Sequence, residues 1–238
     1  MRVLAPLGNT SMSAEWKPES AGAIRQFVAR VKKQVGDAQR KGDIVRYTGG
    51  ASSKFDEARF CLTQIHKIKK GQHGEVELQF YTDAFWWVSW TTLEMLGQVV
   101  NVTEQLGLQE HGVSFHKIWE RITNSGRTTT SRLASRLDRI KNGTLRSWIC
   151  GYRHCASHRR PVFVAISEPK LRVPASYADS TAPLEYSLAK TNRELLMCKH
   201  DTPIIVAPGS MVKLIPRCTK AAKQLDRTLS GVFRLLSK

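Results

Sequence analysis

The stretch that decides the fold is residues 75–106, EVELQFYTDAFWWVSWTTLEMLGQVVNVTEQL. Its apolar positions recur in alternating steps of four and three, the period of one buried helix face. That face carries Phe85, Val88, Thr92, Met95, Val99, Val102 and Leu106. At about 1.5 Å per residue, a helix here is about 50 Å long, which is the length of a bundle element.

An aromatic cluster widens the apolar face of this helix, so that we expect neighbours on two of its sides. The cluster consists of Phe85, Trp86, Trp87 and Trp90. Aromatic rings can also stack on nucleic-acid bases. Because these rings share the hydrophobic period of the helix, core packing is the favoured interpretation.

Several other segments have the same period. We expect helices over Glu19–Val35, from Ser53 to Gly71, and over Val113–Thr123, Thr128–Lys141, Thr144–Ser157 and Arg217–Leu236. Lys41–Gly50 is expected to be a loop. Two short β-like runs, Pro161–Ile166 and Thr202–Val206, are expected to pair. The predicted fold class is therefore mainly α: an up-and-down helical bundle with a small β-hairpin insertion.

The charge of the chain is strongly unbalanced. It has 37 Lys and Arg against 20 Asp and Glu, a net charge of +17. Most of the excess lies in Lys117–Arg160, with eleven basic and two acidic residues, and in Met211–Lys238, with seven basic and one acidic residue. Such segments indicate a polyanionic partner, and we expect RNA. The candidate RNA-binding residues are Arg132, Arg136, Arg139, Arg146, Arg159 and Arg160.

Composition narrows the class of protein. Hydrophobic residues make up 41% of the chain, which is typical of a folded domain. The five cysteines are odd in number and widely spaced, which predicts a reducing compartment and a cytoplasmic location. Pro6 and Gly8 interrupt the start of the chain, so no secretory signal is expected. Acidic residues interrupt the richest apolar stretch, Phe80–Leu106, so no membrane partner is expected.

Reactive side chains gather in residues 150–160, CGYRHCASHRR. One interpretation is a zinc site made by Cys150, His154, Cys155 and His158. Neighbouring helical residues point about 100° apart, so four ligands from one short segment do not close a tetrahedron, and we expect neither metal nor cofactor. A second interpretation makes the cysteines small core residues and the histidines surface groups.

A third interpretation is metal-independent cleavage of RNA, which carries its own nucleophile, the 2′-hydroxyl. Such an enzyme needs a proton acceptor that works near neutral pH and a fixed positive charge beside the phosphate. His158 and Arg153 supply these two groups. They lie about 140° apart on an ideal helix, but Pro161 is expected to end the helix near His158 and let both turn toward one phosphate.

The run from Arg153 through His154 to His158 resembles the signature of the HEPN superfamily. That signature is an Arg, a polar residue, a few further residues and a His, near the end of a bundle helix. The long helix from Asp83, the helix that contains Trp119 and the last amphipathic helix are similarly placed. The resemblance predicts a HEPN-like domain over residues 75–238, with an insertion at about 161–210. Residues 1–74 are predicted to be an N-terminal helical extension.

The resemblance implies a metal-independent endoribonuclease that acts as a homodimer with two motifs facing one cleft. Arg153 would hold the scissile phosphate, His158 would move the proton of the 2′-hydroxyl, and His154 would orient the pair. The products would be a 2′,3′-cyclic phosphate and a 5′-hydroxyl. Many HEPN proteins belong to toxin–antitoxin or phage-defence systems, in which case the antitoxin would be a separate protein. The alternative is a non-catalytic helical module that binds nucleic acid or mediates dimerisation.

Overall fold

The protein is mainly helical, as predicted. The computed structural model describes residues 16–68, 74–124, 131–154, 163–165, 170–172 and 212–237. In chain order the helices are α1 (Glu19–Gln34), α2 (Ala38–Lys67), α3 (Gly74–Thr103), the 3-10 helix η1 (Glu110–Gly112), α4 (Phe115–Asn124), α5 (Ser131–Lys141), α6 (Thr144–His154) and α8 (Leu214–Leu236). The strands are β1 (Phe163–Ala165), β2 (Lys170–Arg172) and β3 (Val212–Lys213).

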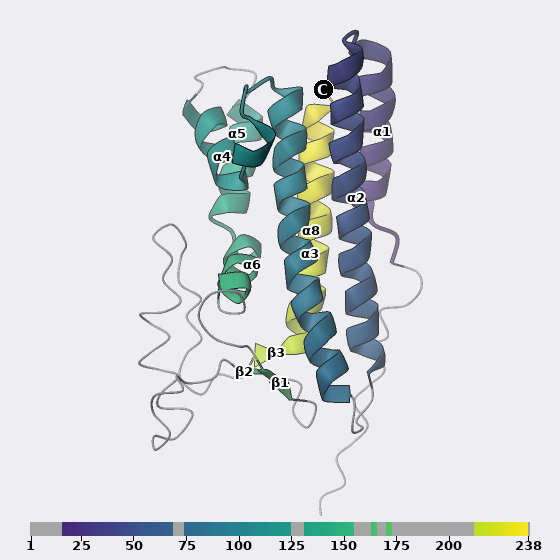
Figure 1. Ribbon diagram of the computed structural model, residues 1–238, viewed down its shortest axis with the longest axis vertical. Helices are drawn as coiled ribbons and strands as arrows, with labels where there is room; N and C mark the ends of the chain where they lie inside the picture. The colour runs from purple at the N-terminus through teal and green to yellow at the C-terminus, as the bar shows by residue number, and fades with distance from the viewer. Residues whose placement is uncertain are drawn as a thin grey trace, which may run out of the picture.

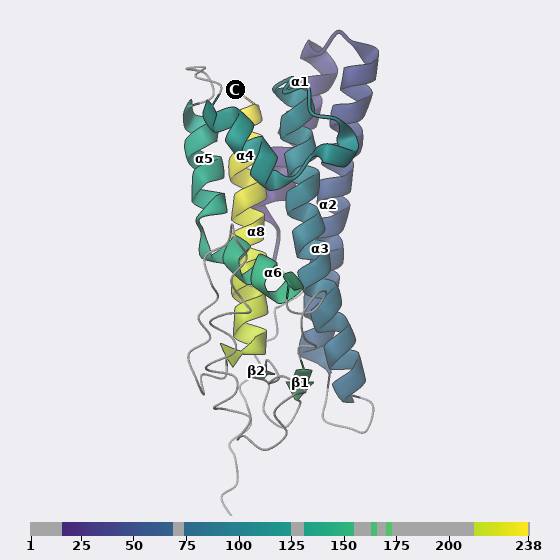
Figure 2. The same ribbon diagram turned by 60° about the vertical axis from the view of Figure 1, so that its left-hand side comes forward.

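The four long helices α1, α2, α3 and α8 form the body of the bundle, and α4, α5 and α6 lie against one side of it (Figures 1 and 2). Helices α2 and α3 are antiparallel and make the most extensive pairing. Helix α8 runs alongside α1 in the same direction, with the Phe27 and Phe233 rings 5.3 Å apart. The shorter helices α4, α5 and α6 lead the chain back toward the end of the bundle where α8 begins (Figure 1).

The loop predicted over Lys41–Gly50 is wrong, because α2 is one unbroken helix through this region. It begins at Ala38, where the Asp37 side chain accepts a hydrogen bond of 2.6 Å from the Arg40 N–H. Ser53 is therefore not its cap. Burial of the face that carries Ile44 outweighs the low helix propensity of the glycines. At Gly50 a Cβ would lie 3.3 Å from the Met95 sulfur, so that glycine lets α3 approach closely.

The N-terminus of α1 is capped from the far end of the chain. Pro18 precedes the helix and offers no capping side chain. Instead the Asp226 carboxylate of α8 accepts hydrogen bonds from the Glu19 N–H at 3.0 Å and the Ser20 N–H at 2.9 Å. Asp226 is only 3% exposed. One buried carboxylate thus fixes α1 on α8 and satisfies two of the unpaired donors of its first turn.

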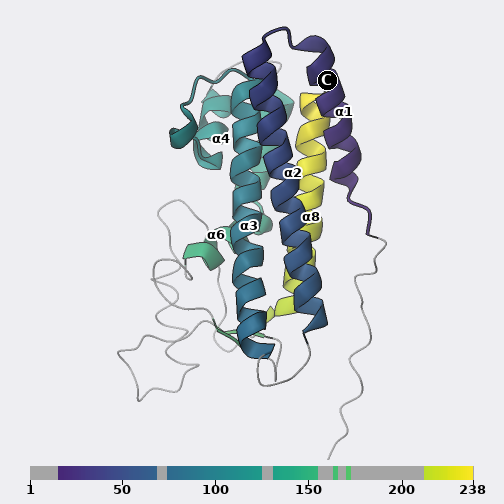
Figure 3. The same cartoon turned by 45° about the vertical axis from the view of Figure 1, so that its right-hand side comes forward.

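The core is continuous from the first helix to the last. Phe27 of α1, Leu62 of α2, Leu96 of α3 and Leu229 of α8 all belong to one cluster of buried apolar side chains. The predicted boundary between residues 74 and 75 falls after the first residue of α3, and the core extends across it. Helices α1 and α2 are thus packed into the bundle itself (Figure 3).

The strands form a small antiparallel sheet in the order β1-β2-β3. The predicted hairpin between Pro161–Ile166 and Thr202–Val206 is not supported. Residues 202–206 lie outside the described part of the chain, and β1 pairs instead with β2, placing Phe163 opposite Arg172. Only residues 166–169 separate β1 from β2, so this pairing costs less loop-closure entropy than one across the long intervening segment.

Candidate nucleic-acid interface

Helix α6 carries the start of the predicted catalytic motif. It begins directly after Gly143, where a Cβ would lie only 2.6 Å from the Arg139 carbonyl oxygen, so this close turn between α5 and α6 requires glycine. Buried Leu145 and Ile149 hold α6 on the bundle, and Arg153 and His154 occupy its last turn.

The rest of the motif, His158 with Arg159 and Arg160, lies outside the described residues. The convergence of Arg153 with His158 therefore stays a prediction. Of the proposed zinc ligands, Cys150 is described and is buried, as the core interpretation expected. Within the described ranges, no three His, Cys, Asp or Glu side chains are grouped as metal ligands.

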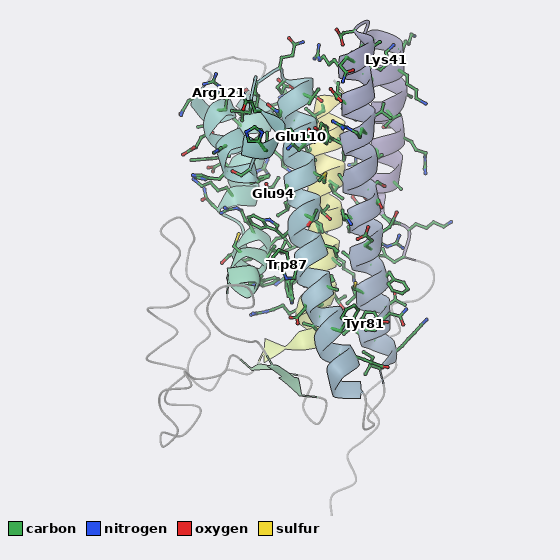
Figure 4. All side chains as sticks on the ribbon, in the orientation of Figure 1. Lys41, Tyr81, Trp87, Glu94, Glu110 and Arg121 are labelled. Atoms are coloured by element: carbon green, nitrogen blue, oxygen red, sulfur yellow. The ribbon has the colours of Figure 1, made fainter. Side chains whose placement is uncertain are left out.

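The aromatic cluster of α3 divides between the core and the surface. Phe85 and Trp86 are fully buried, which confirms core packing for these two rings. Trp90 is partly buried against the same core. Trp87 is 41% exposed and lies between α3 and α6 (Figure 4). It is thus the one ring of the four that a ligand beside α6 can reach.

The three arginines of α5 have different surroundings. Arg132 and Arg139 are exposed, as an RNA contact requires. Arg136 reaches across to α8, where its Nη2 donates a hydrogen bond of 2.6 Å to the Arg227 carbonyl oxygen. Burial, together with the nearby charge of Arg139, lowers the pKa of Arg136 from its usual value. Arg136 therefore joins two helices as well as contributing charge.

Arg146 is not at the surface, although it was predicted to bind RNA. Only 6% of it is exposed. It lies three and four residues before Ile149 and Cys150, which are both buried, so the three share the inward face of α6. The protein itself covers the Arg146 guanidinium. The helical spacing of Arg146 with Ile149 and Cys150 is the sequence signal that predicts this burial.

Helix α8 presents basic residues that were not among the predicted RNA-binding residues. Its exposed charged side chains are Lys220, Lys223, Arg227 and Arg234. Its one acidic residue, Asp226, is buried at the start of α1. The sequence did carry a signal, because these four positions alternate with the buried apolar positions of the same helix at helical spacing. Every exposed charged side chain of α8 is therefore basic.

A tryptophan joins the beginning of α8 to α6. The Arg217 guanidinium lies 5.0 Å and the Lys220 ammonium 5.6 Å from the centre of the Trp148 ring. Burial lowers the pKa of Arg217. Both distances are typical of cation–π contacts. Trp148 lies in the same helix as Arg153, so the basic face of α8 adjoins the helix that carries the motif.

The acidic residue nearest the arginines of α5 is directed elsewhere. The Asp138 carboxylate accepts hydrogen bonds from the indole N–H of Trp119 at 3.2 Å and from the amide of Asn142 at 3.0 Å. On the same side, the Lys141 ammonium lies 3.0 Å from the centre of the Trp119 ring. Asp138 thus ties α5 to α4 through Trp119.

No protein-family model, curated protein or solved structure matches this chain. Among the helices that the structure describes, none is both long enough and apolar enough to cross a membrane.

Proposed function

We propose that this protein binds RNA on the surface shared by α5 and α8 and cleaves it, without a metal, at the end of α6. One observation supports this proposal above all. Helices α5 and α8 pack together and expose Arg132, Arg139, Lys223 and Arg227, while the acid of α8, Asp226, is buried. Exposed like charges held together repel one another and gather counterions, and a polyanion that replaces these counterions gains affinity from their release.

The proposed chemistry uses the motif at the end of α6. His158 accepts the proton of the 2′-hydroxyl, whose oxygen attacks the neighbouring phosphorus. The bond from phosphorus to the 5′-oxygen breaks, and the proton that His158 accepted passes to the leaving oxygen. Arg153 neutralises the charge that develops on the phosphate, and His154 orients the pair. The exposed indole of Trp87 beside α6 offers a base a surface for stacking.

The resemblance of this motif to the HEPN signature supports the same proposal and extends it. By that resemblance the protein is a HEPN-like endoribonuclease of a toxin–antitoxin or phage-defence system, located in the cytoplasm. It acts as a homodimer in which two motifs face each other, and a separate antitoxin protein restrains it.

The decisive experiment incubates the purified protein with total RNA in EDTA. Arg153→Ala and His158→Ala are compared with Arg121→Ala and His111→Ala, which change the same residue types at exposed positions on α4 and η1. Cleavage that persists in EDTA, produces cyclic phosphate ends and is lost only in the first pair supports the enzyme. Cleavage that EDTA abolishes, or that the Arg153 and His158 variants retain, contradicts it.

A second candidate function rests on the same basic surface, namely that of a module that binds RNA without cutting it. Tight, salt-sensitive RNA binding by a wild-type protein that leaves the RNA intact would favour this function. In that case Arg153→Ala and His158→Ala should alter neither the affinity nor the integrity of the RNA.

A further inference from the structure

The exposed charges of α8 form a single narrow row. Lys220, Lys223, Arg227 and Arg234 follow one another at steps of three, four and seven residues. Each residue advances about 100° around a helix, so all four lie within about 60° of its circumference. The row is bounded by α1 on one side of α8 and by α5 on the other, since both helices pack against α8 (Figures 2 and 3).

Arg136 of α5 fills the one gap in this row. The step from Arg227 to Arg234 passes Gly231, which has no side chain. The Arg136 guanidinium lies there: a Cβ on Gly231 would be 2.7 Å from its Cζ and its Nε. Its Nη2 is already fixed by the Arg227 carbonyl oxygen. We call these five residues, Lys220, Lys223, Arg227, Arg136 and Arg234, the basic row; it has a cation at nearly every turn of α8.

Within the described structure, the basic row has little counter-charge of its own. The Asp226 carboxylate is occupied by the Glu19 and Ser20 N–H groups and is buried. The nearest ion pair is at one end, where Arg234 lies 4.0 Å from an exposed Glu19 carboxylate oxygen. Exposed ion pairs of this length are weak. The row therefore has most of its charge available for an external anion.

We propose that the basic row binds the sugar–phosphate backbone of single-stranded RNA, which lies lengthwise along α8. From Lys220 to Arg234 the row spans about 21 Å at about 1.5 Å per residue, and on α8 itself it is one side chain wide. A row of this width follows one strand. Proteins that recognise duplex RNA contact two strands across successive grooves over about 16 base pairs, which needs a wider and longer surface.

One end of the basic row leads to α6. Lys220, at that end, lies 5.6 Å from the ring centre of Trp148, and Trp148 is five residues before Arg153 in the same helix. A strand held along α8 is therefore delivered to the helix that carries the proposed cleavage motif. This inference rests on the proposed function, because it specifies which form of RNA that site receives.

The test measures binding of labelled oligouridine of about 12 nucleotides, and of a hairpin duplex of similar length, over a range of salt concentrations. The variant pair is Lys223→Glu with Arg227→Glu. The matched control is Arg25→Glu with Lys32→Glu, which makes the same charge change at exposed positions on α1. A neutral pair, K223Q with R227Q, avoids new acids, and urea unfolding establishes that every variant is folded.

We expect the wild-type protein to prefer the single strand. Five phosphate contacts predict a slope of log affinity against log salt of about −3.5, and removing two contacts makes it shallower by about 1.4. The Glu pair should weaken binding about ten-fold or more, beyond the effect of its control. Three results would contradict binding of single-stranded RNA by the basic row. They are equal affinity for the duplex, an equal loss of affinity in the α1 control, and an unchanged salt slope in K223Q with R227Q.

The outcomes separate this inference from the proposed function. If the row variants bind RNA as the wild type does, while Arg153→Ala and His158→Ala still abolish cleavage, the basic row is overturned and the endoribonuclease stands. Suppose that the row variants no longer bind single-stranded RNA, while the wild type binds it but never cleaves it. The basic row is then supported as the binding site, and the proposed endoribonuclease activity is contradicted. If the wild type binds no RNA at either low or moderate salt, both proposals fall.

Discussion

Removing the carboxylate of Asp226 should loosen α1 from the bundle. This carboxylate accepts hydrogen bonds from the N–H groups of Glu19 and Ser20, at 3.0 and 2.9 Å, and is 3% exposed. In Asp226→Ala both donors lose their partner. The Ser20 donor cannot turn to water readily, because Ser20 is itself buried.

The size of the effect follows from these contacts. A hydrogen bond to a charged group contributes about 1.5–3 kcal/mol, and loss of an N-cap acceptor costs about 0.5–2 kcal/mol. The two estimates overlap because they describe the same contacts, so we expect Asp226→Ala to lower the free energy of unfolding by about 3 kcal/mol. For a chain of this length, about 2–4 °C of Tm is lost per kcal/mol, which gives a decrease of about 6–12 °C.

Urea unfolding followed by circular dichroism measures the change. Asp56→Ala is the matched control, because Asp56 is an exposed acid whose contact is a surface ion pair with Arg59, and such pairs contribute about 0–1 kcal/mol. A rescue variant tests the mechanism. Pro18→Ser supplies a capping hydroxyl at the start of α1 and should restore about 1 kcal/mol in the Asp226→Ala background. If Asp226→Ala is no more destabilising than Asp56→Ala, the long-range cap contributes nothing and the reasoning is refuted.

Three further predictions follow from other contacts. Gly49→Ala should raise the free energy of unfolding by about 0.5–1 kcal/mol, because Gly49 is exposed within α2 and a Cβ there meets no atom within 4 Å. Gly231→Ala should displace the Arg136 guanidinium and weaken single-stranded RNA binding, measured by fluorescence anisotropy. Burial lowers the pKa of His66, whose Nε2 lies 3.3 Å from the Thr219 hydroxyl. The unfolded chain therefore binds more protons, and stability should fall as pH decreases from about 6.5 through the native pKa, measured by urea unfolding across that range.

Each of these predictions has a control. The control for the first prediction is Gly49→Pro, which should destabilise α2 strongly. If Gly49→Ala lowered the free energy of unfolding, the prediction would be contradicted, because the backbone at position 49 would not be a regular helix. Gly22→Ala, on α1 and away from the basic row, should leave RNA binding unchanged; an equal effect would contradict the role of Gly231. His66→Gln should flatten the acid-side loss of stability, and an unchanged pH profile would assign that loss to other groups.

Elements with a strong apolar period could be predicted from the sequence, whereas those decided by tertiary contacts could not. Helix α3 runs from Gly74 to Thr103 against an expected 75–106, because the period of its buried face extends over its whole length. The first part of α2 is predicted as a loop, and its helix is expected to begin only near Ser53, because glycines and polar residues interrupt the apolar pattern between Lys41 and Gly50. The helix continues there because the face that carries Ile44 is buried and α3 packs closely at Gly50, and both contacts are tertiary.

In the candidate site too, some features could be predicted from the sequence and others depend on tertiary contacts. Charge counting predicts RNA-binding residues on α5 that include Arg132 and Arg139, and both side chains are exposed. It did not distinguish a buried guanidinium such as Arg146 from an exposed one, because charge alone carries no information about which face a residue occupies. The contact of Arg136 with Gly231 joins residues from two helices far apart in the chain, and no local pattern encodes it.

The pairing of α1 with α8 also determines when the protein can fold. The N–H groups that begin α1 depend on a carboxylate 206 and 207 residues further along the chain. During synthesis, α1 emerges before α8, so at that stage it has neither its cap nor the apolar surface of α8 that covers Phe27. The native bundle therefore cannot close until α8 has been synthesised, and until then the apolar face of α1 lacks the partner that covers it and is open to chaperones.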